Sequence, residues 1–285
     1  MAILNKTLII GGGGYIGSRL KTQIRADLVD INWFKKGKKS IDFKDLTREY
    51  YSEYDTIILL AGHSSVKMSE GNLNSCFNNN VRNFIDLLEK LDKQKLIYAS
   101  SSSVYGSVGG KTVNEKYFGF EPYNQYDISK HVADLYAQKS DIEYYALRFG
   151  TVNGYSSFLK LYIKDTMRPI LGINDLCGAV KTIADCNDDK RGLYNLASFN
   201  KTAEQIAYEV ADVMDVDVIE FEVDPTQIQN TKNQTKAYNF SISTLKFRKT
   251  FKYKFQDTVE GLTVELRDKW NYMEKTNRSG VVEYE

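Results

Sequence analysis

A tyrosine and a lysine one helical turn apart could carry out acid–base chemistry in this 285-residue chain. Tyr126 and Lys130 lie in the segment Tyr123–Lys130 and would share one face of a helix. A phenol with a pKa of about 10 is a poor base at neutral pH, whereas an adjacent ammonium stabilises its phenolate and lowers that pKa. Ser101, in the hydroxyl-rich run Ser100–Ser103, would hold the same substrate oxygen by a hydrogen bond. Because the chain contains 20 Tyr, chance spacing on an exposed helix face is the alternative explanation.

A glycine-rich segment near the N-terminus has the spacing of a phosphate-binding turn. Its candidate cofactor-binding residues are Gly11, Gly14, Tyr15, Ile16 and Gly17. The apolar run Thr7–Ile10 predicts a strand directly before the turn, and a helix would begin at Tyr15. Glycines there let the backbone approach a pyrophosphate and let the helix pack on the strand. The position therefore favours dinucleotide binding, and a flexible loop is the alternative.

Asp30 closes the second predicted strand, 19 residues after Gly11. A carboxylate at this position can accept hydrogen bonds from the adenosine ribose and repel a 2′-phosphate. The sequence therefore favours NAD over NADP as the cofactor. Lys35 and Lys36 lie close enough along the chain to keep NADP as an alternative, although a solvated loop is the simpler explanation of these lysines.

Short apolar runs alternate with amphipathic stretches in the first half of the chain, which predicts an α/β fold with a parallel, doubly wound sheet. The predicted strands are Thr7–Ile10, Asp27–Ile31, Ser40–Phe43, Thr56–Leu60, Lys95–Ala99 and Glu143–Leu147. The predicted helices are Asn80–Leu91, Gln125–Gln138, Ala203–Met214 and Asp257–Leu266. The order of elements indicates a Rossmann-like domain followed by a small C-terminal α+β lobe.

Composition excludes several classes of protein. The formal net charge of +1 argues against a nucleic-acid-binding protein, which would carry a basic excess. The three cysteines and two histidines show no spacing of a disulfide framework or a metal site. The N-terminus has only short apolar pieces and predicts no membrane span. We therefore expect a reduced, cytoplasmic location.

The order of these motifs resembles the extended short-chain dehydrogenase/reductase family, specifically the NAD-dependent epimerases and dehydratases that act on nucleotide sugars. The resemblance covers about residues 3–200 and weakens toward residue 265. Its further pieces are Asp45-Leu46, Asp55–Gly62, Asn80-Val81, Ser100–Gly106, Pro122–Lys130, Arg148, Arg168–Asp175 and Tyr194-Asn195.

The resemblance implies a role for each matching residue. It makes Tyr126 the catalytic base, Lys130 its activator and a ribose ligand, and Ser101 the third catalytic hydroxyl. Further cofactor contacts would come from Asp45, Leu46, Leu60, Ala61, Gly62 and Asn80. Asn80 is also a candidate N-cap of the helix that it opens. The nucleotide-sugar substrate would contact Ser101, Ser102, Asn153 and Arg168, with Arg168 clamping the diphosphate.

The reaction predicted from this resemblance is epimerisation at C4 of the sugar, by hydride transfer to NAD and back. Dehydratases of the family have an acidic pair directly after the catalytic hydroxyl, where this chain has Ser102 and Ser103. Serine cannot do that acid–base work at neutral pH, which disfavours dehydration. An NAD(P)H-dependent keto-sugar reductase or dehydrogenase uses the same groups and stays open. A non-catalytic dinucleotide-binding protein is the alternative from another class.

Departures from the family concentrate in the substrate half. Thr151 and Tyr155 stand where the family usually has Asn and Pro, and only 13 residues separate Gly154 from Arg168. No second diphosphate arginine is found within Asp224–Phe247. We predict a cofactor domain over residues 1–154, with 170–197 returning to it, and a substrate lobe over 155–169 and 198–285. The family resemblance further implies a homodimer, in which the two helices at Asn80–Leu91 and Gln125–Gln138 pair across the interface.

Overall fold

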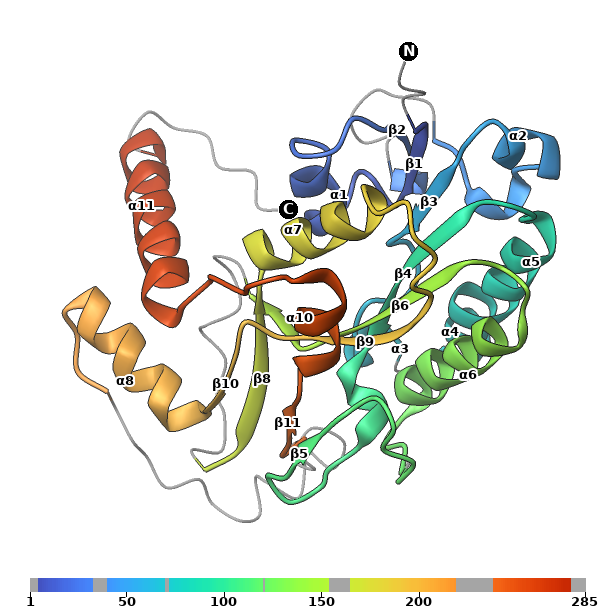
Figure 1. Ribbon diagram of the computed structural model, residues 1–285. Coiled ribbons are helices and arrows are strands. Elements are labelled where there is room, and N and C mark those ends of the chain that lie inside the picture. The colour runs from blue at the N-terminus through green and yellow to red at the C-terminus, as the bar shows by residue number, and fades with distance from the viewer. Residues whose placement is uncertain are drawn as a thin grey trace.

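A six-stranded parallel sheet forms the centre of the protein, seen in a computed structural model that describes residues 5–32, 40–69, 72–119, 121–153, 165–218 and 238–277 (Figure 1). Its strands are β1 (Thr7–Ile10), β2 (Asp27–Val29), β3 (Thr56–Leu59), β4 (Lys95–Ser101), β6 (Tyr144–Phe149) and β9 (Gly192–Leu196), in the order β2-β1-β3-β4-β6-β9. In the register of the sheet, Ile9 of β1 pairs with Leu28 of β2 on one side and with Ile58 of β3 on the other. The predicted doubly wound α/β fold is confirmed.

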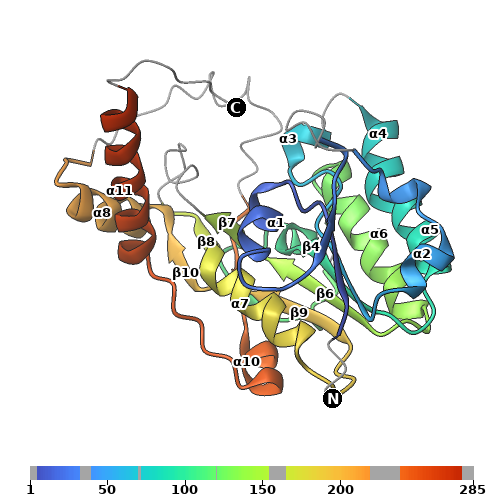
Figure 2. The same cartoon turned by 90° about the horizontal axis from the view of Figure 1, so that it is seen from above.

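Helices connect the strands and flank the sheet. They are α1 (Tyr15–Leu20), α2 (Arg48–Ser52), α3 (Val66–Ser69), α4 (Leu73–Phe77), α5 (Asn83–Lys90), α6 (Gln125–Lys139), α7 (Ile173–Ala184), α8 (Ala203–Met214), α10 (Leu245–Phe251) and α11 (Val259–Asn277). Figure 2 shows α5 and α6 on one side of the sheet and α1 and α7 on the other. None of the helices within the described residues is both long and apolar enough to cross a membrane.

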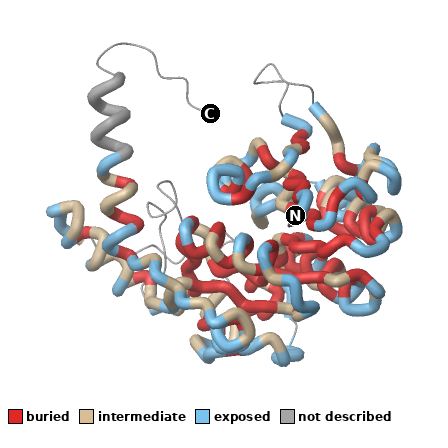
Figure 3. Tube along the Cα trace, turned by 45° about the horizontal axis from the view of Figure 1, so that its top comes forward, coloured by how far each residue is buried: buried red, intermediate tan, exposed pale blue. Residues whose placement is uncertain are grey.

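Side chains of the central strands alternate between two hydrophobic cores, one on each face of the sheet. Leu8 and Ile10 of β1 pack in the core that contains Phe84 of α5, whereas Ile9 packs in the core that contains Leu176 of α7. Because both faces are covered, the strands are buried along most of their length, as the red segments of Figure 3 show. This double burial explains the continuous apolar runs of the sequence.

A smaller sheet is formed by strands that lie before and after β9 in the sequence. It consists of β7 (Thr151–Asn153), β8 (Met167–Gly172) and β10 (Phe199–Thr202), in the order β10-β8-β7. Helices α8 and α11 lie side by side next to it in Figures 1 and 2. A short pair, β5 (Thr112–Val113) and β11 (Ser241–Ile242), links the loop after β4 to the C-terminal part. The division of the chain into two lobes stays a prediction.

The predicted strand at Ser40–Phe43 is wrong. Residues 40–42 have no regular structure, and a 3₁₀ turn, η2 (Phe43–Asp45), begins at Phe43. The Asp42 side chain accepts a hydrogen bond from the Lys44 backbone N–H at 3.2 Å and so caps this turn. A local bond from a side chain to the backbone competes with strand pairing, and the apolar pattern alone does not reveal it.

The helix predicted at Asn80–Leu91 begins earlier than expected. Helical structure starts at Leu73 in α4, runs through the π-helical turn η3 (Asn78–Arg82) and continues as α5. Asn72 caps it, because its side chain accepts from the Ser75 backbone N–H at 2.9 Å. Asn80 therefore lies inside a helical stretch, and its assignment as an N-cap is wrong. The other predicted helices form, with α11 extending past Leu266 to Asn277.

A buried ion pair joins α6 to the central sheet. Arg148 of β6 donates from Nε to Asp134 of α6 at 2.8 Å, and both side chains are at most 5% exposed. Tyr98 of β4 donates to the other Asp134 oxygen at 2.9 Å, while Tyr105 accepts from Arg148 at 3.0 Å. Helix α6, strands β4 and β6 and the turn that contains Tyr105 are thereby held at fixed positions, because every member of the network needs the others to offset its desolvation.

We predict that Arg148→Met lowers the free energy of unfolding by about 3–5 kcal/mol, since it leaves the Asp134 carboxylate buried without its cation. Urea unfolding followed by circular dichroism measures this change. The matched control is Asp185→Asn, which breaks the exposed pair of Lys181 and Asp185 on α7 and should cost less than about 1 kcal/mol. If both variants lost the same free energy of unfolding, burial of the Asp134–Arg148 pair would not matter for its contribution to stability.

Candidate active site

The predicted cofactor residues gather where the carboxyl ends of β1, β2 and β3 meet. In the sheet, β2 lies on one side of β1 and β3 on the other, which creates a crevice at the end of β1. Gly11 has a φ of +89°, and a Cβ on it would lie 2.7 Å from the Ala61 backbone nitrogen. The structure thus brings the glycine turn against the loop after β3. Leu60 begins that loop and donates its backbone N–H to Ile10 O at 2.8 Å.

Two contacts fix the shape of the glycine turn. A Cβ on Gly17 would lie 2.3 Å from Gly11 O, so only glycine lets α1 approach the turn this closely. The Asp30 side chain is 8% exposed, and its Oδ2 accepts from the Gly13 backbone N–H at 2.9 Å. Its Oδ1 accepts from Asn32 N–H at 2.8 Å. Asp30 is therefore placed beside the turn, as predicted, and also helps to hold it.

Asn80 ties the loop after β3 to helix α6. Its Oδ1 accepts from the His63 backbone N–H at 2.8 Å, and its Nδ2 donates to Ser129 Oγ at 3.0 Å. Gly62 has a φ of +118°, and a Cβ there would lie 2.6 Å from Asn80 Oδ1. The His63 ring pairs with Ser75 Oγ at 3.0 Å. This arrangement gives Asn80 a structural role that its position in the sequence did not suggest.

Tyr126, Lys130 and Ser101 meet at the end of β4. Lys130 Nζ donates to Ala99 O at 2.9 Å and lies 5.7 Å from the centre of the Tyr126 ring. Ser101, the last residue of β4, lies close enough to Tyr126 to act on the pKa of its phenol. Tyr126 and Lys130 are each 8% exposed. The alternative of an exposed helix face is thereby wrong, because α6 turns both residues inward.

Burial governs the pKa values of this pair. Desolvation raises the pKa of Tyr126 to about 12, although Ser101 acts in the opposite direction. Desolvation likewise lowers the pKa of Lys130 to about 8. The expected lowering of the Tyr126 pKa by the lysine is not found in this structure, in which the Lys130 ammonium instead donates to a backbone carbonyl.

Sequence reasoning missed a hydroxyl and carboxylate cluster next to these residues. Ser103 Oγ lies 2.8 Å from Ser101 Oγ, and Ser103 acts to lower the pKa of the Asp127 carboxyl. Tyr238 donates its hydroxyl to the Asp127 carboxylate at 2.8 Å. The one local signal is Asn124, the N-cap of α6, three residues before an acidic residue. Nothing in the sequence connects Asp127 with Tyr238, which lies 111 positions further on.

Arg168, predicted to bind the substrate, lies on β8 and reaches toward the same cluster. Its guanidinium donates to Tyr238 O at 3.2 Å. Ser102 is buried in the 3₁₀ turn η4 (Ser102–Tyr105). Asn153 is the last residue of β7, and its side chain lies outside the described part of the chain. The shortened segment after Gly154, which includes Tyr155, lies almost wholly outside the described residues.

The remaining cofactor residues lie further from the catalytic group. Asp45 ends η2 and is exposed, and Leu46 packs against the hydrophobic core below α5. Tyr15 and Ile16 form the start of α1, directly after Gly14. Their contacts with a cofactor stay predictions. Lys35 and Lys36, on which the NADP alternative depends, lie outside the described residues.

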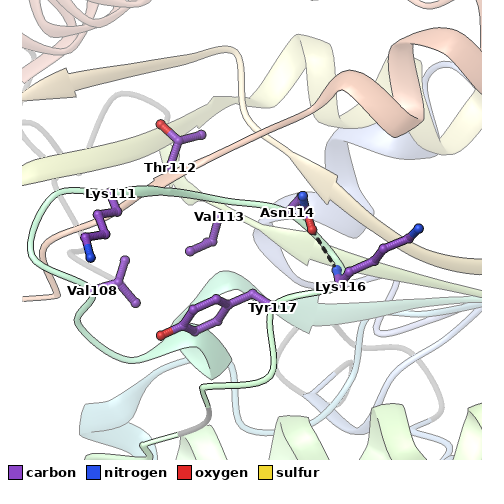
Figure 4. Close-up of a pocket in the computed structure, with 7 residues that line it drawn as sticks. All are labelled: Val108, Lys111, Thr112, Val113, Asn114, Lys116 and Tyr117. Carbon is purple, nitrogen blue, oxygen red and sulfur yellow. Dashed lines mark hydrogen bonds between the residues drawn. The ribbon is translucent and has the colours of Figure 1, made fainter.

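A hollow of about 390 Å³ lies in the loop between η4 and α6 (Figure 4). Its lining residues are Val108, Lys111, Thr112, Val113, Asn114, Lys116 and Tyr117. The Lys116 backbone N–H donates to Asn114 Oδ1 at 2.9 Å and closes a turn at one side of the hollow. None of the predicted site residues lines it, so the hollow is separate from the Tyr126 group.

Curated proteins resemble about half of this chain in sequence. The sequence is 27% identical over 176 residues to a UDP-glucose 4-epimerase of Lactobacillus helveticus and 26% identical over 182 residues to Protein CapI of Staphylococcus aureus. Each match covers 53% or 52% of this chain and 53% or 54% of the relative, so the chain spans about half the length of these curated relatives.

Solved structures match over almost the whole chain. MoeE5 in complex with UDP-glucose and NAD superposes with a TM-score of 0.78 at 19% identity, covering 94% of this chain and 99% of that one. UDP-glucuronic acid 4-epimerase from Bacillus cereus, in complex with UDP-glucuronic acid and NAD, gives 0.76 at 17% identity, with coverage of 95% and 99%. At such identities the likeness establishes the fold. The profile of the NAD dependent epimerase/dehydratase family matches residues 7–190, which is more than half of the chain, and the protein therefore belongs to this family.

Proposed function

We propose that this protein is an NAD-dependent epimerase that inverts C4 of a nucleotide sugar, with Tyr126 as the base. The observation that carries this proposal is the meeting of Tyr126, Lys130 and Ser101 at the end of β4, in the same sheet edge as the glycine turn and Asp30. Relatives named as UDP-glucose 4-epimerase and UDP-glucuronic acid 4-epimerase support the reaction class.

The residues around the glycine turn fit NAD. A Cβ at Gly11, Gly17 or Gly62 would collide with neighbouring protein atoms, so these glycines let the turn, helix α1 and the loop after β3 pack closely together. Asp30 keeps lone pairs for ribose hydroxyls beyond the two backbone N–H groups that it accepts. A carboxylate there repels a 2′-phosphate, which favours NAD over NADP. The chemistry that NAD supplies when bound is reversible acceptance of hydride from a carbinol carbon.

The catalytic residues divide the proton chemistry among them. Tyr126 takes the proton of the sugar hydroxyl, and Ser101, which lies close to Tyr126, binds the same oxygen through its hydroxyl. Lys130, fixed by Ala99 O, keeps further N–H groups to donate to the cofactor ribose. Epimerisation requires only that the keto-sugar rotates in the site, so that hydride returns to the opposite face of the ketone. No acid–base group for loss of water is required, in keeping with serine at positions 102 and 103.

The substrate proposed for this site is a nucleoside diphosphate sugar. Arg168 offers a planar, permanently charged donor for a diphosphate, and its position is fixed by Tyr238 O. Tyr238 also contacts Asp127 on α6, so the arginine and the catalytic helix share one neighbour. UDP-glucose and UDP-glucuronic acid, the sugars bound in the two solved relatives, are the first candidates to test.

We further propose a homodimer. The family resemblance implied that the helix at Asn80–Leu91 pairs with α6, but large apolar residues of α5 are buried within the chain, so we place the interface on α6 and α4 instead. The outward face of α6 exposes Ile128, Leu135 and Tyr136 at 44–49%, and α4 exposes Leu73 and Phe77 at more than half of their surface. Large apolar side chains that gather on adjacent helices favour burial by a second copy.

Tyr126→Phe should lower the rate of epimerisation by at least about 10²-fold, because it removes the proton acceptor. Affinity for NAD should stay within a few fold, since the ring and Lys130 are kept. Chromatographic analysis of a panel of UDP-sugars gives the rate, and calorimetry gives the NAD affinity. Net NADH formation or consumption in the wild type would indicate a reductase instead. If the wild type binds NAD and converts none of the panel, the epimerase proposal fails.

Asp30→Ser should reduce the preference for NAD over NADP by about tenfold or more, because it removes the charge that repels a 2′-phosphate. Dissociation constants for both cofactors, measured by calorimetry, give this ratio. The substitution also removes the acceptor of Gly13 N–H, which would weaken the binding of both cofactors equally. An unchanged ratio would therefore show that Asp30 acts only as a brace of the turn.

Leu135→Glu should convert the dimer into a monomer, because it places a charge in the apolar face of α6. Sedimentation velocity over a range of concentrations measures the equilibrium. Lys139→Glu, at the exposed end of the same helix, is the control and should leave the dimer intact. A wild-type protein that sediments as a monomer at every concentration would refute the proposed interface.

A further inference from the structure

The hydroxyl of Tyr238 ties the first residues of helix α6 together. It donates to the two oxygens of the Asp127 carboxylate, at 2.9 and 2.8 Å, and accepts from Asn124 Nδ2 at 2.8 Å. Asn124 is the N-cap of α6, and its Oδ1 accepts from the Asp127 backbone N–H at 3.0 Å. Because a phenol hydroxyl has one proton and free lone pairs, it can serve both partners at once. Tyr238 thereby completes a closed ring of hydrogen bonds around the turn that contains Tyr126.

Burial makes this ring costly to open. Asp127 is 0% exposed, and within the described ranges no lysine or arginine forms a salt bridge with it. Besides the Tyr238 hydroxyl, its carboxylate accepts the Tyr123 backbone N–H at 3.1 Å, and the rings of Tyr123 and Tyr238 pack with their centres 5.3 Å apart. A buried carboxylate that loses a donor is destabilised. Loss of the Tyr238 hydroxyl would therefore act on the residue directly after the proposed base.

The backbone of the same residue is held by strand β8. Arg168 of β8 donates from its guanidinium to Tyr238 O at 3.2 Å. The next two residues are also bonded to β8, because Asn239 Oδ1 accepts from the Met167 N–H at 2.9 Å and Phe240 N–H donates to Met167 O at 3.2 Å. Tyr238 thus spans two elements. Its carbonyl contacts the arginine proposed to bind the diphosphate, and its hydroxyl contacts the turn that carries the base.

We propose that Tyr238 is a positioning residue that couples diphosphate binding at Arg168 to the alignment of Tyr126. A diphosphate that fixes the guanidinium of Arg168 also fixes the carbonyl of Tyr238, and the hydroxyl of Tyr238 then holds the first turn of α6 in place. No proton or electron passes along this route. The inference rests on the proposed function, in which Tyr126 is the base and Arg168 binds the diphosphate.

Tyr238→Phe removes the hydroxyl and keeps both the ring and the carbonyl that holds Arg168. In the full-length protein loaded with NAD, it should lower kcat for the nucleotide sugar that the wild type converts by about tenfold or more, because a small misplacement of a reacting group is costly. KM for the same sugar should change by less than about threefold, since the contact of Arg168 is kept. Rates are expressed per molecule of bound NAD, so that a partial loss of folded protein does not imitate the result.

The matched control is Tyr54→Phe, which also removes a tyrosine hydroxyl that donates to a carboxylate. Tyr54 donates to Asp27 Oδ2 at 3.0 Å near the amino ends of β2 and β3, away from the crevice at their carboxyl ends. This variant should leave kcat and KM unchanged. Asp127→Ala tests the link from the other side. Combined with Tyr238→Phe, it should give a protein no slower than the slower single variant, because the two residues act as one unit.

Hydrogen exchange tests the coupling without turnover, with UDP as the probe. The backbone N–H groups of Asp127 and Ile128 are bonded to Asn124, so their exchange reports opening of the first turn of α6. In the wild type, saturating UDP should slow exchange in the peptide that covers residues 124–130 by about threefold or more. The slowing should vanish in Tyr238→Phe, whose UDP affinity is checked by calorimetry. It should also vanish in Arg168→Met, which leaves Tyr238 itself unchanged.

Three results would overturn the coupling while leaving epimerase activity of the wild type untouched. UDP could slow exchange equally in the wild type and in Tyr238→Phe, it could fail to slow exchange in the wild type, or Tyr238→Phe could change kcat no more than Tyr54→Phe does. The proposed function fails by a different result. If UDP slows exchange only while Tyr238 keeps its hydroxyl, in a protein that converts no nucleotide sugar, the epimerase proposal is wrong and the coupling stands.

Discussion

The buried pair of Asp134 and Arg148 is the constraint on which the active site depends. Helix α6 carries Tyr126 and Lys130, and its inner face is built mainly of polar and small residues. A purely apolar face would let a helix settle in several neighbouring registers. Polar anchors allow only one register, because a shift of the helix would leave buried charges without partners. Asp134 bound to Arg148 and Tyr98, together with Lys130 bound to Ala99 O, thus fixes where the Tyr126 hydroxyl lies.

The same arrangement inverts the usual amphipathic pattern of a surface helix. Apolar residues of α6 such as Leu135 face outward, while Asp127, Lys130 and Asp134 face the interior. In a helix that serves only the core of its own subunit, this pattern would be unfavourable on both faces. It is explained if the inner face serves catalysis and the outer face is covered by another subunit. Function and association are then two consequences of one helix orientation.

The sequence predicted most of the sheet and the proximity of Tyr126 to Lys130 at the end of β4, because both depend on local patterns. Continuous apolar runs such as Thr7–Ile10 follow from burial on both faces, and the glycine turn has its own spacing. The strand at Ser40–Phe43 failed, since the side chain of Asp42 stabilises a turn that apolar periodicity does not report. The helix starting at Leu73 was missed because α4 is only five residues long, which is too short for its apolar residues to show a helical period.

Contacts between distant segments were beyond local patterns altogether. The hydrogen bond between Asp127 and Tyr238 joins segments that are far apart in the sequence. The same holds for the hydrogen bond between Asn80 and the loop after β3. In the sequence, neither Tyr238 nor His63 lies within one helical turn of the residue that it contacts. Periodicity identifies an apolar face but does not say whether that face meets its own core or another molecule.

Residues that resemble cofactor and catalytic ligands also hold the loops of the site in place. Asp30 binds the Gly13 N–H, Asn80 binds the His63 backbone, and Lys130 binds Ala99 O, all within the protein itself. The crevice is therefore shaped by its own side chains before a ligand enters, which reduces the ordering cost of binding. It also means that substitutions of these residues change loop geometry and ligand contact together. Ratios between two ligands, or shifts in a pH profile, separate these effects, whereas a simple loss of activity does not.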